Sequence, residues 1–219
     1  MNRRTLLLGT VGAVAVVSTG GWIAQIAGAP QTHFITPAAA QDAPEIIPDI
    51  PMGSPDAKVT IIEYGSFTCP HCAEFHNTVF GQLKKDYIDT GKVRFILREV
   101  YFDKFGLWAA MVAQCGGAPR YYGIVDMIYE GQRDWFGDGQ DQTVADNLRK
   151  IGLKAGLSQE QLDACLNDQK KAQAMVATYQ KHATEDGIDA TPSFVINGQK
   201  YSNMSYADFK KILDEKLAG

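Results

Sequence analysis

The chain has 219 residues, of which 45% are hydrophobic and 21% are charged, and its formal net charge at pH 7 is −4. This balance is typical of a folded globule and excludes a mainly disordered chain. The length predicts one domain, and a mildly acidic composition without a basic block argues against nucleic acid as a partner.

The first forty residues have the pattern of an export signal. Arg3 and Arg4 supply positive charge, a long apolar run follows, and three alanines occupy 38–40. This order predicts a secretory signal peptide over 1–40, and the arginine pair also resembles a twin-arginine signal. The alternative is an uncleaved membrane anchor, because 5–29 carries no charge and is long enough to span a bilayer. In either case we expect the rest of the chain in the periplasm or another extracytoplasmic compartment.

The next elements alternate between strand and helix patterns. Residues 41–57 hold four prolines and few large apolar residues, which predicts an extended lead-in rather than a packed element, followed by a folded domain over 58–219. Residues 59–64 (VTIIEY) form a nearly continuous apolar run, as in a strand buried on both faces. Apolar residues at three- and four-residue spacing predict a helix over about 72–88, and 93–100 is again β-rich. This order predicts a βαβ unit with parallel strands.

The rest of the chain is helical first and then returns to strand. Apolar stripes at helical spacing run through 103–187, which predicts an insertion of several helices. A strand pattern follows at 193–196, Asn197-Gly198 predicts a hairpin turn, and an amphipathic helix closes the chain. The predicted fold class is α/β, a small sheet with a helical insertion between the βαβ unit and the C-terminal hairpin and helix.

Cys69, Pro70, His71 and Cys72 place two thiols two residues apart where a helix is predicted to begin. A sulfur just before a helix lies near unpaired N–H groups and the positive end of the dipole, so Cys69 is expected to ionise readily. Pro70 fits the first turn because its missing N–H had no partner there, and a protonated His71 adds positive charge. Cys72 lies one turn deeper, facing the sheet, where it can attack a mixed disulfide at Cys69.

Other interpretations of this motif are a metal site and a binding module without turnover. His71 and His76 could complete a four-ligand set with the two sulfurs. The proline between the cysteines and the helix that begins there suit redox chemistry better, and an oxidising compartment disfavours free thiols. By itself, His76 is expected on the helix surface or partly packed.

Three further residues bear on the chemistry. Glu63 shares a strand face with Val59 and Ile61 and should be buried, where its carboxylate could exchange a proton with Cys72. The alternative is an acid at a strand end that reaches solvent. Thr191-Pro192 precedes the strand at 193–196, and from these residues alone an ordinary trans turn is expected.

Cys115 and Cys165 lie on predicted apolar helix faces. Four cysteines can pair in three ways, and the close spacing of Cys69 and Cys72 leaves Cys115 and Cys165 as the second pair. In an exported chain we expect them to form a structural disulfide. The alternative is two buried small hydrophobes.

Taken together, these residues resemble the DsbA-like thiol:disulfide oxidoreductases, which have a thioredoxin fold. The resemblance covers 58–219 and rests on C-P-H-C after VTIIEYGSFT, on the helical insertion, and on T-P-S-F-V before Asn197-Gly198. It implies that Cys69 attacks, that Cys72 resolves, and that Pro192 is a cis-proline packed against them. Thr191 would offer backbone to an extended substrate, and Glu63 matches the buried acid of the family.

The resemblance also implies an activity and partners. The protein would oxidise cysteines of translocated proteins without a cofactor, and a DsbB-like membrane quinone reductase would reoxidise it. No N-terminal dimerisation module is recognisable, which favours a monomer. Two positions depart from the best-studied oxidases: Thr191 replaces their valine, as in isomerases and thioredoxins, and His76 replaces an acid. The closest alternative is therefore a reductase or isomerase on the same scaffold. The Cys115/Cys165 pair resembles an extra bridge of some family members.

Overall fold

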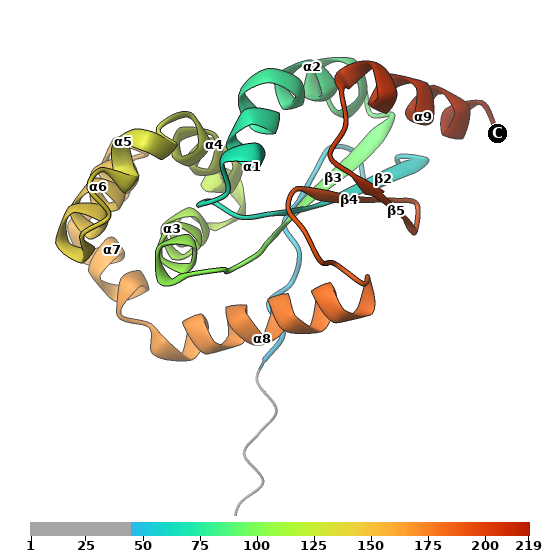
Figure 1. Ribbon diagram of the computed structural model, residues 1–219. Coiled ribbons are helices and arrows are strands. Elements are labelled where there is room, and N and C mark those ends of the chain that lie inside the picture. The colour runs from blue at the N-terminus through green and yellow to red at the C-terminus, as the bar shows by residue number, and fades with distance from the viewer. Residues whose placement is uncertain (1–44) are drawn as a thin grey trace, which may run out of the picture. The chain divides into compact units, whose positions relative to one another are not determined.

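The computed structural model describes residues 45–219, so the expected signal segment lies outside the described residues. Its centre is a mixed five-stranded sheet with the order β1-β3-β2-β4-β5 (Figure 1). The central strand β2 is parallel to β3 and antiparallel to β4, which confirms the predicted βαβ unit. The strands are β1 (Pro51–Met52), β2 (Val59–Gly65), β3 (Val93–Glu99), β4 (Ser193–Ile196) and β5 (Gln199–Ser202).

Strand β2 is buried on both faces, as its apolar run predicts. Val59 and Ile61 belong to the main core, whereas Tyr64 faces a smaller cluster with Val100 and Val195 on the other side. Because successive side chains of a strand alternate between the faces, Glu63 shares the side of Val59 and Ile61. The register therefore places a carboxylate inside the main core, near the carboxyl end of the central strand.

A continuous helical segment follows β2 and carries the C-P-H-C motif. It begins at Pro70, two residues before the predicted start, because proline fits a first turn that needs no N–H donor. Two stretches of π-helix interrupt its α-helical hydrogen bonding. The parts of this segment are α1 (Pro70–Phe75), η1 (His76–Phe80), α2 (Gly81–Leu83) and η2 (Lys84–Ile88).

The predicted helical insertion lies between β3 and β4. A disulfide joins Cys115 at the end of α3 to Cys165 in α7, with their Cα atoms 5.8 Å apart, which confirms the predicted pair. None of the helices within 45–219 is long and apolar enough to cross a membrane. The helices are α3 (Lys104–Cys115), α4 (Gly117–Glu130), α5 (Gln132–Phe136), α6 (Asp141–Lys154), α7 (Gln159–Leu166) and α8 (Gln169–Glu185), and α9 (Tyr206–Ala218) closes the chain.

The hairpin between β4 and β5 has the predicted turn. Asn197 and Gly198 have φ angles of 47° and 81°, and Ile196 pairs with Gln199 across them. Two consecutive positive φ angles are the geometry of a two-residue type I′ turn, which Asn-Gly favours. This turn returns the chain so that β4 can pair with β2 beside the motif.

The prediction of an unpacked lead-in over 41–57 is wrong for the described part of that segment. β1 pairs antiparallel with the edge of β3, and Arg98 binds the Asp49 carboxylate through two hydrogen bonds of 3.0 and 2.9 Å. The Ile47 N–H also donates to Thr178 Oγ1 at 2.8 Å. Partners distant in the sequence therefore order a stretch whose own composition predicts no packing.

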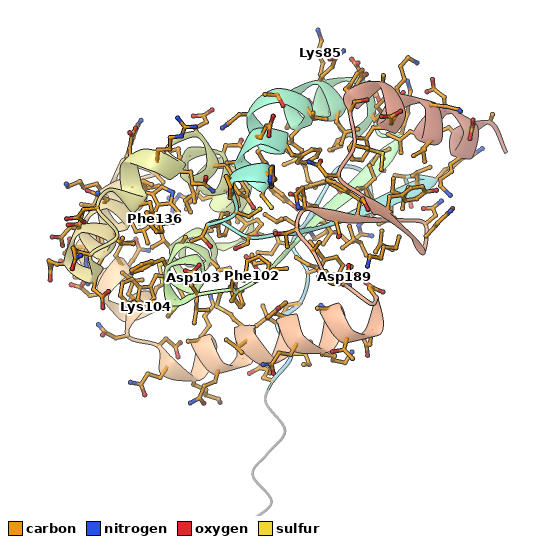
Figure 2. All side chains as sticks on the ribbon, in the orientation of Figure 1. Lys85, Phe102, Asp103, Lys104, Phe136 and Asp189 are labelled. Atoms are coloured by element: carbon orange, nitrogen blue, oxygen red, sulfur yellow. A yellow bond between two sulfur atoms is a disulfide. The ribbon has the colours of Figure 1, made fainter. Side chains whose placement is uncertain are left out.

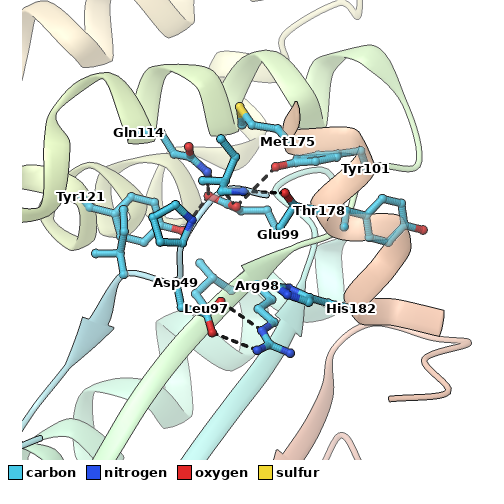
Figure 3. Close-up of a pocket in the computed structure, with 14 residues that line it drawn as sticks. Asp49, Leu97, Arg98, Glu99, Tyr101, Gln114, Tyr121, Met175, Thr178 and His182 are labelled. Atoms are coloured by element: carbon cyan, nitrogen blue, oxygen red, sulfur yellow. Dashed lines mark hydrogen bonds and ion pairs between the residues drawn. The ribbon is translucent and has the colours of Figure 1, made fainter. Parts of the chain in front are cut away.

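This lead-in also covers a small hollow beside β3, α3 and α8 (Figure 3). Inside it, the Glu99 carboxylate accepts hydrogen bonds from the Tyr121 hydroxyl at 2.7 Å, the Gln114 amide at 3.1 Å and the Tyr101 hydroxyl at 3.3 Å. Burial raises the pKa of Glu99, and the donated hydrogen bonds oppose that rise. Glu99 is thus a partly buried acid whose hydrogen-bond partners are neutral.

Candidate active site

The two cysteines of the motif differ sharply in exposure. Cys69 is the N-cap residue of α1 and is partly exposed, whereas Cys72 in the first turn is 0% exposed, and both are free thiols. The Ser66 N–H donates to Cys72 Sγ at 3.4 Å, and Cys69 Sγ lies 3.5 Å from the carbonyl oxygen of Thr191. Cys69 is accordingly the sulfur that a substrate can reach.

The environment separates the pKa values of the two thiols. A hydrogen bond from the Cys72 thiol is the main cause that lowers the pKa of Cys69 to about 5; burial opposes it, and the contact with Thr191 and the N–H groups of Cys72 and His71 add to it. The same contact with Cys69 raises the pKa of Cys72, and burial and the charge of Glu63 raise it further. Near neutral pH the pair is therefore one thiolate, on Cys69, and one thiol, on Cys72.

The residues between the cysteines occupy the first turn. Pro70 is at the start of α1, as predicted. The His71 side chain is 71% exposed and its Nδ1 lies 3.8 Å from the Glu74 carboxylate. The structure thus places the backbone N–H of His71 at the Cys69 sulfur, while the imidazole faces outward beside an acid.

Pro192 and Thr191 lie against the motif although they are more than one hundred residues away in the chain. The Thr191-Pro192 peptide bond is cis, as the resemblance implies and not trans as the residues alone suggest. Pro192 is buried and Thr191 is partly exposed. The Thr191 carbonyl that meets Cys69 therefore belongs to a stretch at the entrance of β4, where an extended chain has backbone groups to pair with.

Glu63 is 0% exposed, as predicted from its strand face, and its Oε2 lies 2.9 Å from Nε2 of His76. The prediction that His76 lies on the helix surface or is partly packed is wrong, because its side chain is 3% exposed and its ring stacks on Tyr129 at 4.1 Å. A signal for this was present in the sequence. His76 is four residues after Cys72, so both side chains lie on the same helix face.

Gln132 is a further residue of the site that the sequence did not reveal. Its side-chain amide donates to the carbonyl oxygens of Phe67 and Cys69 at 2.8 and 2.9 Å. The helical insertion thereby holds the loop that leads into the motif. No local pattern connects α5 with residues more than sixty positions earlier, and only the tertiary fold brings them together.

The ligand set of the alternative metal site is not assembled. Within 45–219, no three His, Cys, Asp or Glu side chains are grouped closely enough to hold a metal ion. His76 binds Glu63 and His71 faces Glu74, so neither imidazole joins the two sulfurs.

Comparisons with known proteins agree with this architecture. Residues 46–215 match a family model described as Thioredoxin. A Rickettsia typhi protein that carries the name "Putative protein-disulfide oxidoreductase" is 34% identical over 170 residues, which are 77% of this chain and 62% of that protein. Disulfide bond formation protein D of Bacillus subtilis is 27% identical over 186 residues, with 77% of each chain covered. The match thus spans less than two thirds of the Rickettsia typhi relative.

Solved structures show the same fold. The crystal structure of Wolbachia pipientis alpha-DsbA1 superposes with a TM-score of 0.71 at 29% identity, over 80% of this chain and 94% of that one. Oxidised BdbD from Bacillus subtilis superposes with a TM-score of 0.69 at 24% identity, over 81% of this chain and 100% of that one. The fold and the paired cysteines define a thioredoxin-fold protein, and the chain belongs to the thioredoxin family. Within that family it is DsbA-like.

Proposed function

We propose that this protein is a thiol:disulfide oxidoreductase that donates the Cys69–Cys72 disulfide to cysteine pairs of other proteins. The observation that carries the proposal is the separation of the two pKa values, with Cys69 lowered to about 5 and Cys72 raised. A stabilised thiolate is a good leaving group, and it also stabilises the reduced form, so the oxidised form tends to accept electrons.

The steps balance as an exchange of two electrons. A substrate thiolate attacks Cys69 Sγ of the disulfide, the bond to Cys72 breaks, and Cys72 leaves with the electron pair and takes a proton. A second substrate thiolate then attacks the substrate sulfur of the mixed disulfide, and Cys69 leaves as a thiolate. The substrate is oxidised to a disulfide, and this protein becomes the reduced dithiol.

The lowered pKa of Cys69 sets a scale for the driving force. At pH 7 a thiol with a pKa of about 5 has a ratio of thiolate to thiol of about one hundred. Since a tenfold change in the equilibrium corresponds to about 30 mV for a two-electron couple, this ionisation raises the reduction potential by at most about 60 mV. Screening at the partly exposed sulfur reduces this value. The direction nevertheless favours an oxidant over a reductant.

An aromatic surface next to the motif supports protein substrates. Phe102, just before α3, is 61% exposed, and Phe136, at the end of α5, is 37% exposed; Figure 2 labels both. Phe105 packs against Phe136, with the ring centroids 5.6 Å apart. Thr68, next to Cys69, donates to the Asp103 carboxylate at 2.7 Å, which ties this surface to the motif. Exposed apolar rings on a surface linked to the motif in this way suit an unfolded chain with apolar side chains.

The resemblance and the relatives also support a place of action and a partner. The substrates would be exported proteins with free cysteine pairs in the periplasm, and a DsbB-like membrane enzyme would return Cys69 and Cys72 to the disulfide. The chain would act as a monomer. Thr191, whose carbonyl meets Cys69, favours a reductase or isomerase as the second candidate, because the resemblance associates threonine at this position with those classes.

The test is disulfide formation in a reduced, unfolded protein with two cysteines. The oxidised chain should form the substrate disulfide stoichiometrically, and Cys69→Ser should form none. Cys72→Ser should accumulate a mixed disulfide at Cys69, because no second sulfur competes for it. An active Cys69→Ser variant would refute the proposed function.

A further inference from the structure

The proposed exchange requires a proton at a place that solvent does not reach. Cys72 must lose its proton when it attacks Cys69 and must regain one when it leaves. Cys72 and Glu63 are both 0% exposed. The charge of Glu63 is among the causes that raise the pKa of Cys72, so the two groups interact. A carboxylate that exchanges a proton with Cys72 must itself exchange it with another group.

His76 is the titratable partner of Glu63 in the described part of the chain. Its Nε2 lies 2.9 Å from Glu63 Oε2, while its Nδ1 is buried without a hydrogen-bond partner. His76 also lines an open lateral hollow together with Asn77, Asp126 and Glu130. Its ring therefore lies between an enclosed carboxylate and a space that opens to the surface.

Acidic and hydroxyl groups surround the His76 ring. Glu63 faces it from β2, and Asp126, Tyr129 and Glu130 face it or the lateral hollow from α4. Partial burial raises the pKa of the Asp126 carboxyl, and His76 lowers it. Glu130 and Lys84 from η2 have smaller effects, the first raising this pKa and the second lowering it. Burial raises the pKa of Tyr129 far above its usual range, so this hydroxyl keeps its proton. The stacked imidazole is the one of these neighbours that is seen to bind Glu63.

We propose that His76 is a positioning residue that exchanges a proton with the lateral hollow, so that its charge follows that of Glu63 during the Cys72 step. When Cys72 attacks Cys69 Sγ, the new bond joins the two cysteines and the partner sulfur leaves with the electron pair. The Cys72 proton moves to Glu63 while Nδ1 of the protonated ring releases a proton to the hollow, and Nε2 keeps its proton and its hydrogen bond to Glu63. When a substrate opens the disulfide, the protons move in the reverse direction. The inference rests on the proposed function.

The test measures the Cys72 step itself. The reduced full-length protein is mixed with excess oxidised glutathione between pH 4 and 9 and quenched with acid, and mass spectrometry counts the glutathione mixed disulfide at Cys69 over time. In His76→Gln the amide can still donate to Glu63 but cannot titrate. His182→Gln in α8 is the matched control, because this histidine lies in the other hollow beside Arg98.

For the native chain we expect the decay of the mixed disulfide to depend on pH with two inflections. His76→Gln should slow the decay about tenfold near pH 7, which is the scale of one lost charged hydrogen bond, and should remove one inflection. His182→Gln should leave rate and profile unchanged. A native rate and profile in His76→Gln would overturn the inference while the proposed function stands. A native chain that forms no mixed disulfide would overturn both.

A second variant guards against misfolding of His76→Gln. Asp126 and Glu130 are exposed, so the pair Asp126→Asn and Glu130→Gln changes the charge near His76 without changing the core. Removal of two acids disfavours the protonated ring, so the inflection assigned to His76 should move to lower pH. An inflection that does not move would contradict the proposal.

Discussion

Gly65 is a position where a single methyl group should disturb the buried acid. A Cβ atom added there would lie 2.9 Å from Glu63 Oε1, 2.9 Å from the Tyr129 hydroxyl and 3.1 Å from Leu97 Cδ1. All three neighbours are buried, so they cannot yield by moving into solvent. Overpacking of this kind costs about 1–3 kcal/mol. We therefore expect Gly65→Ala to lower the free energy of unfolding by about 2 kcal/mol.

Urea unfolding monitored by tryptophan fluorescence measures this change, with Gly81→Ala as the matched control. Gly81 lies in α2, and an added Cβ would meet nothing within 4 Å. Alanine should raise stability there by up to about 1 kcal/mol, because it is the better helix former. Gly65→Ala with native or greater stability would show that the space between Glu63 and Tyr129 is not as tight as described.

Three other predictions concern Cys69, Glu99 and the Cys115–Cys165 disulfide. Titration of the reduced protein by thiolate absorbance should show Cys69 ionising with a midpoint near 5, and a midpoint near 9 would contradict the effect of Cys72 and the helix N-terminus. Because burial raises the pKa of Glu99 in the folded state, its ionisation costs stability; this cost is absent below the ordinary value of 4.5 and grows as the pH rises towards the folded value. Glu99→Gln should therefore flatten the decline of unfolding free energy above pH 4.5, and an unchanged decline would refute this assignment. Loss of the Cys115–Cys165 bridge, which spans 50 positions, should destabilise Cys115→Ser by about 4 kcal/mol, measured by urea unfolding with Cys69 and Cys72 kept reduced; no loss would contradict a stabilising bridge.

Much of the fold was predictable because its signals are local. The apolar run of β2, the Asn197-Gly198 turn and the helical stripes of the insertion each depend on neighbours within a few residues. The lead-in was mispredicted because Asp49 is ordered by Arg98 and β1 by β3, which are partners that composition does not reveal. The helix begins at Pro70, before the first residue of its apolar pattern. Pro70 lies in the first turn and is not part of the apolar stripe, so the stripe alone does not reveal it.

The site divides in the same way. The C-P-H-C spacing at a helix start predicts an accessible Cys69 and a buried Cys72, and strand alternation predicts the burial of Glu63. The prediction for His76 was wrong because it gave more weight to the polarity of the side chain than to its position on the helix face of Cys72. Its buried partner, Glu63, lies on β2 and meets His76 only in the folded structure. Gln132 carries no chemical signature of its own. Its contacts with the motif loop depend on how the helical insertion folds back over it.

The measurement that tests the account most directly is the equilibrium of Cys69 and Cys72 with glutathione. A thiolate on Cys69 that is stabilised in the reduced form predicts a reduction potential clearly above that of thioredoxin and towards the roughly −120 mV of strongly oxidising DsbA. A potential near −270 mV, as in thioredoxin, would contradict disulfide donation and favour a reductase.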